Sequence, residues 1–176
     1  MYYRRALQPG GCYFFTVNIA DRDKTLLVSH IELLREVVRQ VKLRHPFQID
    51  AMVVLPEHLH AIWTLPEGDA DFSKRWGLIK ANFSRGLAKN ESISKSRMLK
   101  GERGIWQRRY WDHLIRDAED YRRHVDYIHF NPVKHGFAQR CADWPYSSFH
   151  RYVSRDVLPI NWGERVMDFS EYGFGE

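Results

Sequence analysis

Two apolar segments separated by a short turn constrain the fold of this 176-residue chain more than any other feature. Residues 47–55 (FQIDAMVVL) and residues 58–65 (HLHAIWTL) lie on either side of Pro56-Glu57. Short apolar runs bounded by turn residues are typical of β-strands, and two in succession predict a β-hairpin. The unbroken apolar end of the first run indicates a strand that is buried on both faces. We therefore expect a folded core that is built on a sheet containing this hairpin.

Segments on both sides of the hairpin add further elements. Residues 12–20 (CYFFTVNIA) are aromatic and β-branched, which predicts a strand. Ser29 and Glu32 have the spacing of a capping box and precede an apolar stripe at helical intervals, which predicts a helix. Ser73 is expected to cap a second helix that reaches Leu87.

The rest of the chain completes an alternating order of strands and helices. Residues 105–116 predict a fourth strand, and residues 117–131 predict a third helix that is capped by Asp117 and ended by Pro132. The order strand, helix, strand, strand, helix, strand is the split βαβ pattern of ferredoxin-like α+β folds. We expect one domain over residues 1–176, with a βαββαβ core at about 10–136, an additional helix, and an aromatic tail at about 137–176.

Composition and charge narrow the class of protein. The chain is 44% hydrophobic and 14% aromatic, which excludes a disordered polypeptide, and no apolar run is long enough for a membrane helix. Two cysteines cannot form a disulfide framework, so we expect a reduced, cytoplasmic protein. The net charge is +5, but residues 73–110 contain eleven basic and two acidic residues. This segment indicates a nucleic-acid surface, although a solvated basic helix and loop would also explain it.

His58 and His60 are the sharpest local feature that could support chemistry. Alternate residues of a strand point to the same face, so both imidazoles are expected to project together. Paired imidazoles suit a divalent metal ion, and two unrelated histidines remain the alternative. Glu57 could orient a histidine or belong only to the turn, and we favour the turn. The other histidines considered (His113, His124, His129 and His135) are expected to be surface or packing residues.

The predicted third helix offers a tyrosine and an asparagine on one face. Tyr121, Val125 and Ile128 form its apolar stripe, whereas Tyr127 and Asn131 lie one turn apart and off that stripe. A tyrosine hydroxyl can attack a phosphodiester if its high pKa of about 10 is offset. A divalent cation held by the histidines would polarise the phosphate. Together these residues favour transesterification, which leaves a phosphotyrosine link and a free hydroxyl.

Two stretches resemble a known family of enzymes. Residues 54–60 (VLPEHLH) resemble the HUH motif (His, hydrophobic, His) of single-tyrosine transposases, and residues 127–136 (YIHFNPVKHG) resemble the catalytic helix of that family. Over nearly its full length the chain is similar to the REP-associated tyrosine transposases, with further likeness at residues 14–18 (FFTVN), 63–69 (WTLPEGD) and 143–145 (DWP).

The resemblance implies a specific activity. It makes Tyr127 the nucleophile and His58, His60 and Asn131 the ligands of Mg²⁺ or Mn²⁺. Imidazole ligands alone would favour Mn²⁺ or Zn²⁺ over Mg²⁺, so the scissile phosphate and water would have to supply oxygens. The wider superfamily places Gln or Glu where this chain has the shorter Asn131.

The resemblance also implies the DNA partner. The substrates would be single-stranded REP hairpins with a flanking tetranucleotide, bound by a monomer in the cytoplasm and at the nucleoid. Candidate DNA contacts are the basic residues Arg4, Arg5, Lys74, Arg75, Lys80, Arg85, Arg108 and Arg109. One alternative is a catalytically silent protein that only binds hairpin DNA. Another is a replication-initiator or relaxase-type nickase, which the order of histidines before tyrosine disfavours.

Overall fold

The computed structural model describes residues 7–89 and 93–164 of the chain. Its strands are β1 (Cys12–Asn18), β2 (Gln48–Val54), β3 (His58–Thr64) and β4 (Trp111–Leu114). Its helices are α1 (Leu26–Ser29), α2 (Ile31–Arg44), α3 (Phe72–Gly86), α4 (Lys95–Met98), α5 (Ala118–Lys134) and α6 (Phe149–Ser154), and a 3-10 turn, η1, spans Cys141–Asp143. The predicted order of strands and longer helices is confirmed.

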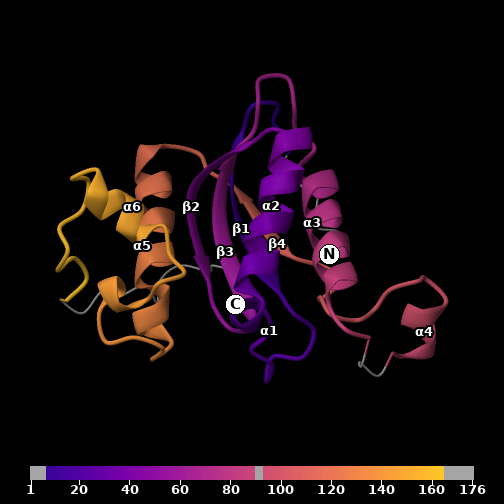
Figure 1. Cartoon of the computed structure of the whole chain (residues 1–176). Helices are drawn as coiled ribbons and strands as arrows, with labels where there is room; N and C mark the ends of the chain where they lie inside the picture. Colours follow the sequence, from indigo (N-terminus) through magenta and orange to yellow (C-terminus); the bar gives the residue numbers. More distant parts are fainter. Residues whose placement is uncertain (1–6, 90–92, 165–176) are drawn as a thin grey trace, which may run out of the picture.

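The four strands form one antiparallel sheet in the order β2-β3-β1-β4. β2 and β3 are the predicted hairpin, and β3 lies between β1 and β2, which makes the sheet the split βαβ arrangement of a ferredoxin-like α+β fold. Helices α2 and α3 cover one face of the sheet and α5 covers the other (Figure 1). Side chains that alternate along β3 therefore face two different helical layers.

The two faces bury different sets of side chains. Toward α2 and α3 the core is aromatic, and the indole rings of Trp63 and Trp76 stack with centroids 4.1 Å apart. Toward α5 it contains Phe14 and Ile62 from the sheet and Ile128 from the helix. Leu59, Ala61 and Trp63 of β3 belong to the aromatic core, and Ile62 belongs to the core beneath α5. Since side chains alternate along a strand, His58 and His60 share the face of Ile62, and the prediction that they project together is confirmed.

Two predicted helix caps are wrong. Ser29 is the last residue of α1, and α2 begins after His30, whose side chain makes no capping bond. Helix α3 begins earlier than expected, because the Asp71 carboxylate accepts a hydrogen bond from the backbone amide of Lys74. Asp71 satisfies an amide of the first turn, so Ser73 lies inside the helix and not at its cap.

The predictions for the later elements are correct in type but not in length. Strand β4 is shorter than the predicted segment 105–116, and Trp106 instead forms an isolated bridge with Ile19. Asp117 caps α5 as expected. Pro132 does not end the helix, which continues to Lys134, because a proline near the last turn removes only one donor and few bonds follow it.

The described part of the tail packs along the outer edge of β2. Ser147 bridges to Val53, the amide of Val54 donates to the carbonyl of Tyr146, and the indole Nε1 of Trp144 donates to the carbonyl of Val54. Phe149 of α6 is fully buried. Among the described residues, no helix has both the length and the apolar character that a membrane crossing requires.

Candidate active site

The two histidines of β3 lie side by side beneath α5. Both residues are fully buried, and their ring centroids are 4.9 Å apart. Each ring is held at Nδ1: Glu57 lies 2.9 Å from Nδ1 of His58, and the Thr16 hydroxyl lies 2.9 Å from Nδ1 of His60. A partner at one ring nitrogen fixes the orientation of the imidazole and directs Nε2 toward a ligand.

Glu57 is therefore more than a turn residue, contrary to the sequence interpretation. Burial acts to raise the pKa of its carboxyl, but the hydrogen bond and charge of His58, together with Arg22, hold this pKa below its usual range. An ionised Glu57 favours the Nδ1–H tautomer of His58, and such a tautomer presents Nε2 to a metal ion. The signal in the sequence was only its position next to His58.

Helix α5 carries a buried tyrosine and a buried asparagine and covers the face of the sheet on which the histidines lie. Tyr127 is 1% exposed, and its ring centroid lies 5.2 Å from that of His60. Asn131 is fully buried, and its Oδ1 atom and the Nε2 atom of His58 are both inaccessible to solvent. Tyr127 lies away from the apolar stripe in sequence but is still buried, because the ring of Phe14 packs against it from the sheet. The structure thus brings His58, His60 and Tyr127 together, and Asn131 follows Tyr127 by one turn of the same helix.

Two residues at the end of α5 also reach this site: Lys134, which the sequence analysis did not single out, and His135, which it expected to be a surface or packing residue. The Nζ atom of Lys134 donates a hydrogen bond of 3.1 Å to the hydroxyl of Tyr127. The ring of His135 lies 5.2 Å from the ring of His58. Spacings of seven and eight residues from Tyr127 return to the same helix face, and this periodicity could have identified both.

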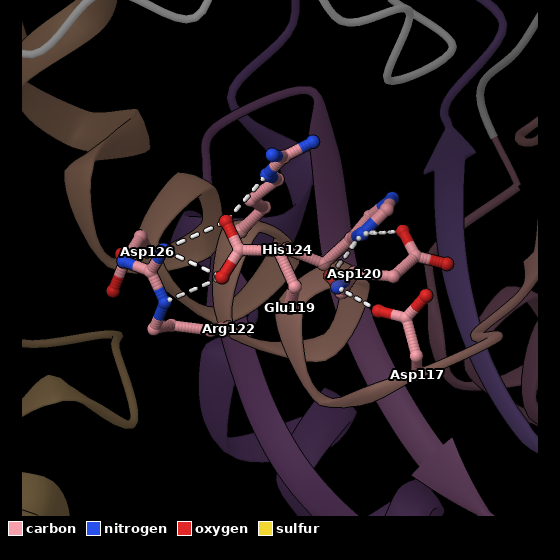
Figure 2. A network of polar contacts seen from close by, with 7 residues as sticks. Asp117, Glu119, Asp120, Arg122, His124 and Asp126 are labelled. Atoms are coloured by element: carbon pink, nitrogen blue, oxygen red, sulfur yellow. Dashed lines mark hydrogen bonds and ion pairs between the residues drawn. The ribbon is translucent and has the colours of Figure 1, made fainter.

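A second polar cluster lies at the start of α5. Asp120 is 2.8 Å from Nε2 of His113 on β4 and 3.1 Å from Nδ1 of His124, and the two imidazoles stack with centroids 4.7 Å apart. Figure 2 shows Asp120 and His124 within the wider polar network of this turn. Burial acts to raise the pKa of Asp120, but the hydrogen bonds from His113 and the Arg116 amide hold it below its usual range. The cluster offers three potential metal-ligand atoms within 4.8 Å of one another, one carboxylate oxygen and two imidazole nitrogens.

The basic residues proposed as DNA contacts separate into two groups. Lys74, Arg85, Arg108 and Arg109 are exposed, whereas Lys80 is partly buried and donates to the carbonyl of Gln107. A cleft of about 470 Å³ between α3 and residues 101–108 is lined by several of them. Arg4 and Arg5 lie outside the described residues.

Arg75 does not belong to an exposed basic surface. It is 3% exposed, forms an ion pair with Asp69, and donates to the carbonyls of His45, Pro46 and Asp71. All the donors of its guanidinium are directed at groups of the protein itself. Arg75 thus joins the start of α3 to the end of α2. We therefore no longer expect this residue to contact DNA.

The fold and the histidine–tyrosine site point to a class of DNA-processing enzymes, and comparison with known proteins agrees. Residues 11–131 match the family model described as "Transposase IS200 like". The chain is 49% identical to the REP-associated tyrosine transposase of Escherichia coli over 168 residues, which cover 96% of this chain and 94% of that protein. A relative from Haemophilus influenzae is 44% identical over 162 residues, 92% of each chain.

A solved structure gives the same assignment. It is described as a REP-associated tyrosine transposase bound to a REP hairpin, and it aligns with a TM-score of 0.84 and 48% identity over 100% of this chain and 97% of its own. The chain therefore belongs to the IS200-like transposases and, among them, to the REP-associated tyrosine transposases. These are enzymes that cleave and rejoin DNA.

Proposed function

We propose that this protein cleaves and rejoins single-stranded DNA beside REP hairpins through a covalent phosphotyrosine at Tyr127. The observation that carries the proposal is the buried Tyr127 ring against His60, with His58 beside His60 and the buried Asn131 one turn further along α5. A relative of 48% identity is described as bound to a REP hairpin, which supports the same DNA partner for this chain.

The donor set suits a divalent cation. His58 and His60 would bind it through Nε2, since Glu57 and Thr16 hold the two Nδ1 atoms, and Asn131 would add an amide oxygen. Two nitrogen ligands and one neutral oxygen leave coordination positions for phosphate oxygens and water, which Mg²⁺ and Mn²⁺ require. The bound cation would polarise the scissile phosphate and offset the charge that develops on it.

The residues of the chain would divide the remaining work. The oxygen of Tyr127 attacks the phosphorus, its proton leaves to water, and the bond from phosphorus to the departing deoxyribose oxygen breaks. That oxygen gains a proton and becomes the free hydroxyl, so the phosphodiester energy is kept in the phosphotyrosine bond for rejoining. The Phe14 ring packs against both His60 and Tyr127 and would hold the nucleophile in position.

The remaining basic residues would bind the DNA around this site. Lys74, Lys80, Arg85, Arg108 and Arg109 form the proposed phosphate-contacting surface, with Arg4 and Arg5 as further contacts from the N-terminal segment. We expect recognition of a flanking tetranucleotide, action as a monomer, one functional unit over residues 1–176, and a location at the nucleoid in the cytoplasm. Because phosphate contacts release counterions, hairpin affinity should fall steeply with salt.

A gel assay of covalent complex formation tests the proposal. The wild-type protein is incubated with an end-labelled single-stranded REP hairpin carrying natural flanks, with Mg²⁺, Mn²⁺ or EDTA, and products are resolved under denaturing conditions. We expect a metal-dependent protein–DNA band that is absent in Tyr127→Phe, because this variant lacks only the attacking oxygen. His58→Ala and His60→Ala should lose the band while still binding the hairpin.

Control variants separate the nucleophile from other tyrosines. Tyr121→Phe removes a hydroxyl that lies on the same helix but bonds to Tyr152 at 3.4 Å, and it should retain the covalent band. A band that persists in Tyr127→Phe would refute the assignment. Hairpin binding with no band in any metal would instead favour a protein that binds hairpins without cutting them.

A further inference from the structure

Lys134 at the end of α5 makes a hydrogen bond to the proposed nucleophile, Tyr127. The ammonium of Lys134 donates to the hydroxyl of Tyr127 over 3.1 Å, and its Nζ lies 4.8 Å from the centroid of the tyrosine ring. Lys134 follows Tyr127 by seven residues, which brings it to the same face of α5 after two turns. Asn131 lies between the two on that face and is fully buried. The lysine therefore reaches back along the face that carries the proposed nucleophile and metal ligand.

The two partners of this bond differ in burial. Tyr127 is 1% exposed, whereas Lys134 occupies an exposed position on the last turn of α5. A long aliphatic stem allows an exposed lysine to place its charged end against a partly buried group. A fixed positive charge thus stands beside the one oxygen that would form the new bond to phosphorus.

The position of the substrate follows from that of the nucleophile. For attack, the scissile phosphorus must approach the tyrosine oxygen to about 3–3.5 Å. The non-bridging oxygens of that phosphate then lie next to the tyrosine oxygen, and Lys134 already contacts this oxygen. From this geometry we propose that Lys134 is a further catalytic residue, which binds a non-bridging oxygen of the scissile phosphate and stabilises its charge in the transition state. The proposal rests on the function proposed above.

Lys134 neither gives up nor takes up a proton in the chemical step. The lysine stays protonated throughout, and its N–H moves from the tyrosine oxygen to a phosphate oxygen as the oxygen–phosphorus bond forms. The tyrosine proton passes to water, and the leaving deoxyribose oxygen takes its proton from water. Lys134 contributes only charge and a donor, which is the kind of stabilisation that a preorganised site supplies most effectively.

The alternative explanation is purely structural: Lys134 stabilises helix α5, because a cation at the C-terminus of a helix interacts favourably with the helix dipole. That role would contribute to stability but not to the rate of the chemical step. The two explanations therefore differ in what a charge-removing substitution changes.

Single-turnover cleavage with four variants separates them. Lys134→Met removes the charge and keeps the stem, Lys134→Gln removes the charge and keeps a donor, and Lys134→Arg keeps a charge and donors. Lys42→Met is the matched control, because it removes a lysine charge from the last turn of α2 on the opposite face of the sheet. We expect Lys134→Met to slow formation of the covalent complex by about 10²–10³-fold, the usual effect of removing one such donor. Lys134→Arg should recover part of the rate, and Lys42→Met should match the wild type.

A binding measurement gives a second readout that a purely structural lysine would not change. Once the cleaved phosphate is mapped with the wild-type protein, a neutral methylphosphonate replaces it, and hairpin affinity is measured in EDTA. The wild type should lose several-fold in affinity when this charge is removed, and Lys134→Met should lose little, because the partner of that charge is already absent.

The outcomes distinguish the two proposals. If the wild type forms no covalent complex, the proposed function fails and the role of Lys134 fails with it. If the wild type reacts and Lys134→Met or Lys134→Gln reacts at the same rate, only the role of Lys134 is overturned. Equal losses of affinity on the methylphosphonate in wild type and variant would also overturn it, even if one variant proved too unstable for kinetics.

Discussion

Replacement of Arg75 by methionine should weaken the fold and leave DNA binding almost unchanged. The guanidinium is buried and donates to both oxygens of Asp69 and to the carbonyls of His45, Pro46 and Asp71. Methionine preserves most of the packing of the stem but leaves these acceptors without their donor. The effect of the substitution can be estimated from these bonds.

The carbonyl bonds to His45, Pro46 and Asp71 should together contribute about 2 kcal/mol, toward the low end for three such bonds because Asp71 is exposed. The ion pair with Asp69 should add about 1–2 kcal/mol, at the lower end for a buried charge because the Asp69 side chain is 33% exposed. We therefore expect Arg75→Met to lower the free energy of unfolding by about 3–4 kcal/mol. For a chain of this length the melting temperature should fall by about 6–16 °C.

Urea unfolding and hairpin binding, measured side by side, provide the assay. Lys74→Met is the matched control, because Lys74 is the adjacent residue of the same helix and is exposed. It should change stability by less than about 0.5 kcal/mol and should reduce hairpin affinity and its dependence on salt. If Arg75→Met proved as stable as Lys74→Met and lost hairpin affinity in the same way, the structural role of Arg75 would be refuted.

Two further predictions concern pH and the tail. Burial lowers the pKa of His129 to about 3. Below about pH 6.5 this imidazole is therefore protonated in the unfolded chain but stays neutral in the folded one. Stability should therefore fall as the pH drops from about 6.5 toward 3, and His129→Gln should lose less stability than the wild type between pH 7.5 and pH 5 in urea titrations; an identical pH dependence would contradict this. Trp144→Phe removes the 2.9 Å bond from Nε1 to the carbonyl of Val54 but keeps a ring, so it should cost about 1 kcal/mol in the same assay. No change would mean that this bond does not help to hold the tail.

Local patterns in the sequence predicted the sheet well. The alternation of His58, His60 and Ile62 with Leu59, Ala61 and Trp63 identifies the two faces of β3, because a period of two has only one physical interpretation. The hairpin and the order of elements followed from similar short-range signals. These features depend on neighbours in the chain, and the sequence contains those neighbours.

Features that depend on distant contacts were harder to predict. Ser29 has the spacing of a cap, but it is the last residue of the short helix α1 and therefore does not cap α2. Arg75 is one of eleven basic residues in its segment, and only the approach of Asp69 and the end of α2 shows that it is buried. The burial of Tyr127 likewise depends on Phe14, which is more than a hundred residues away in the chain.

The candidate site shows the same division. His58, His60, Tyr127 and Asn131 could be selected by residue type and spacing; the structure buries all four and packs Tyr127 against His60. Thr16 could not, because threonine is common and only its hydrogen bond to His60 distinguishes it. Spacing alone offers Glu57 and Lys134 as neighbours of the site, and their hydrogen bonds are what assign them to it. Residues that support a site are defined by geometry more than by type.

The contact of the tail with β2 has a consequence for how the chain avoids its own aggregation. A strand at the border of a sheet presents unpaired amides and carbonyls that can template pairing with another molecule. Here Tyr146, Ser147 and Ser148 occupy that border and satisfy backbone groups of Met52 and Val54. A chain shortened before Trp144 would keep α5 and its tyrosine, but it would expose the unpaired backbone groups of β2 to pairing with another molecule. Shortened forms of the protein made for biochemical work should therefore retain the segment through α6, whether or not this segment contributes to DNA binding.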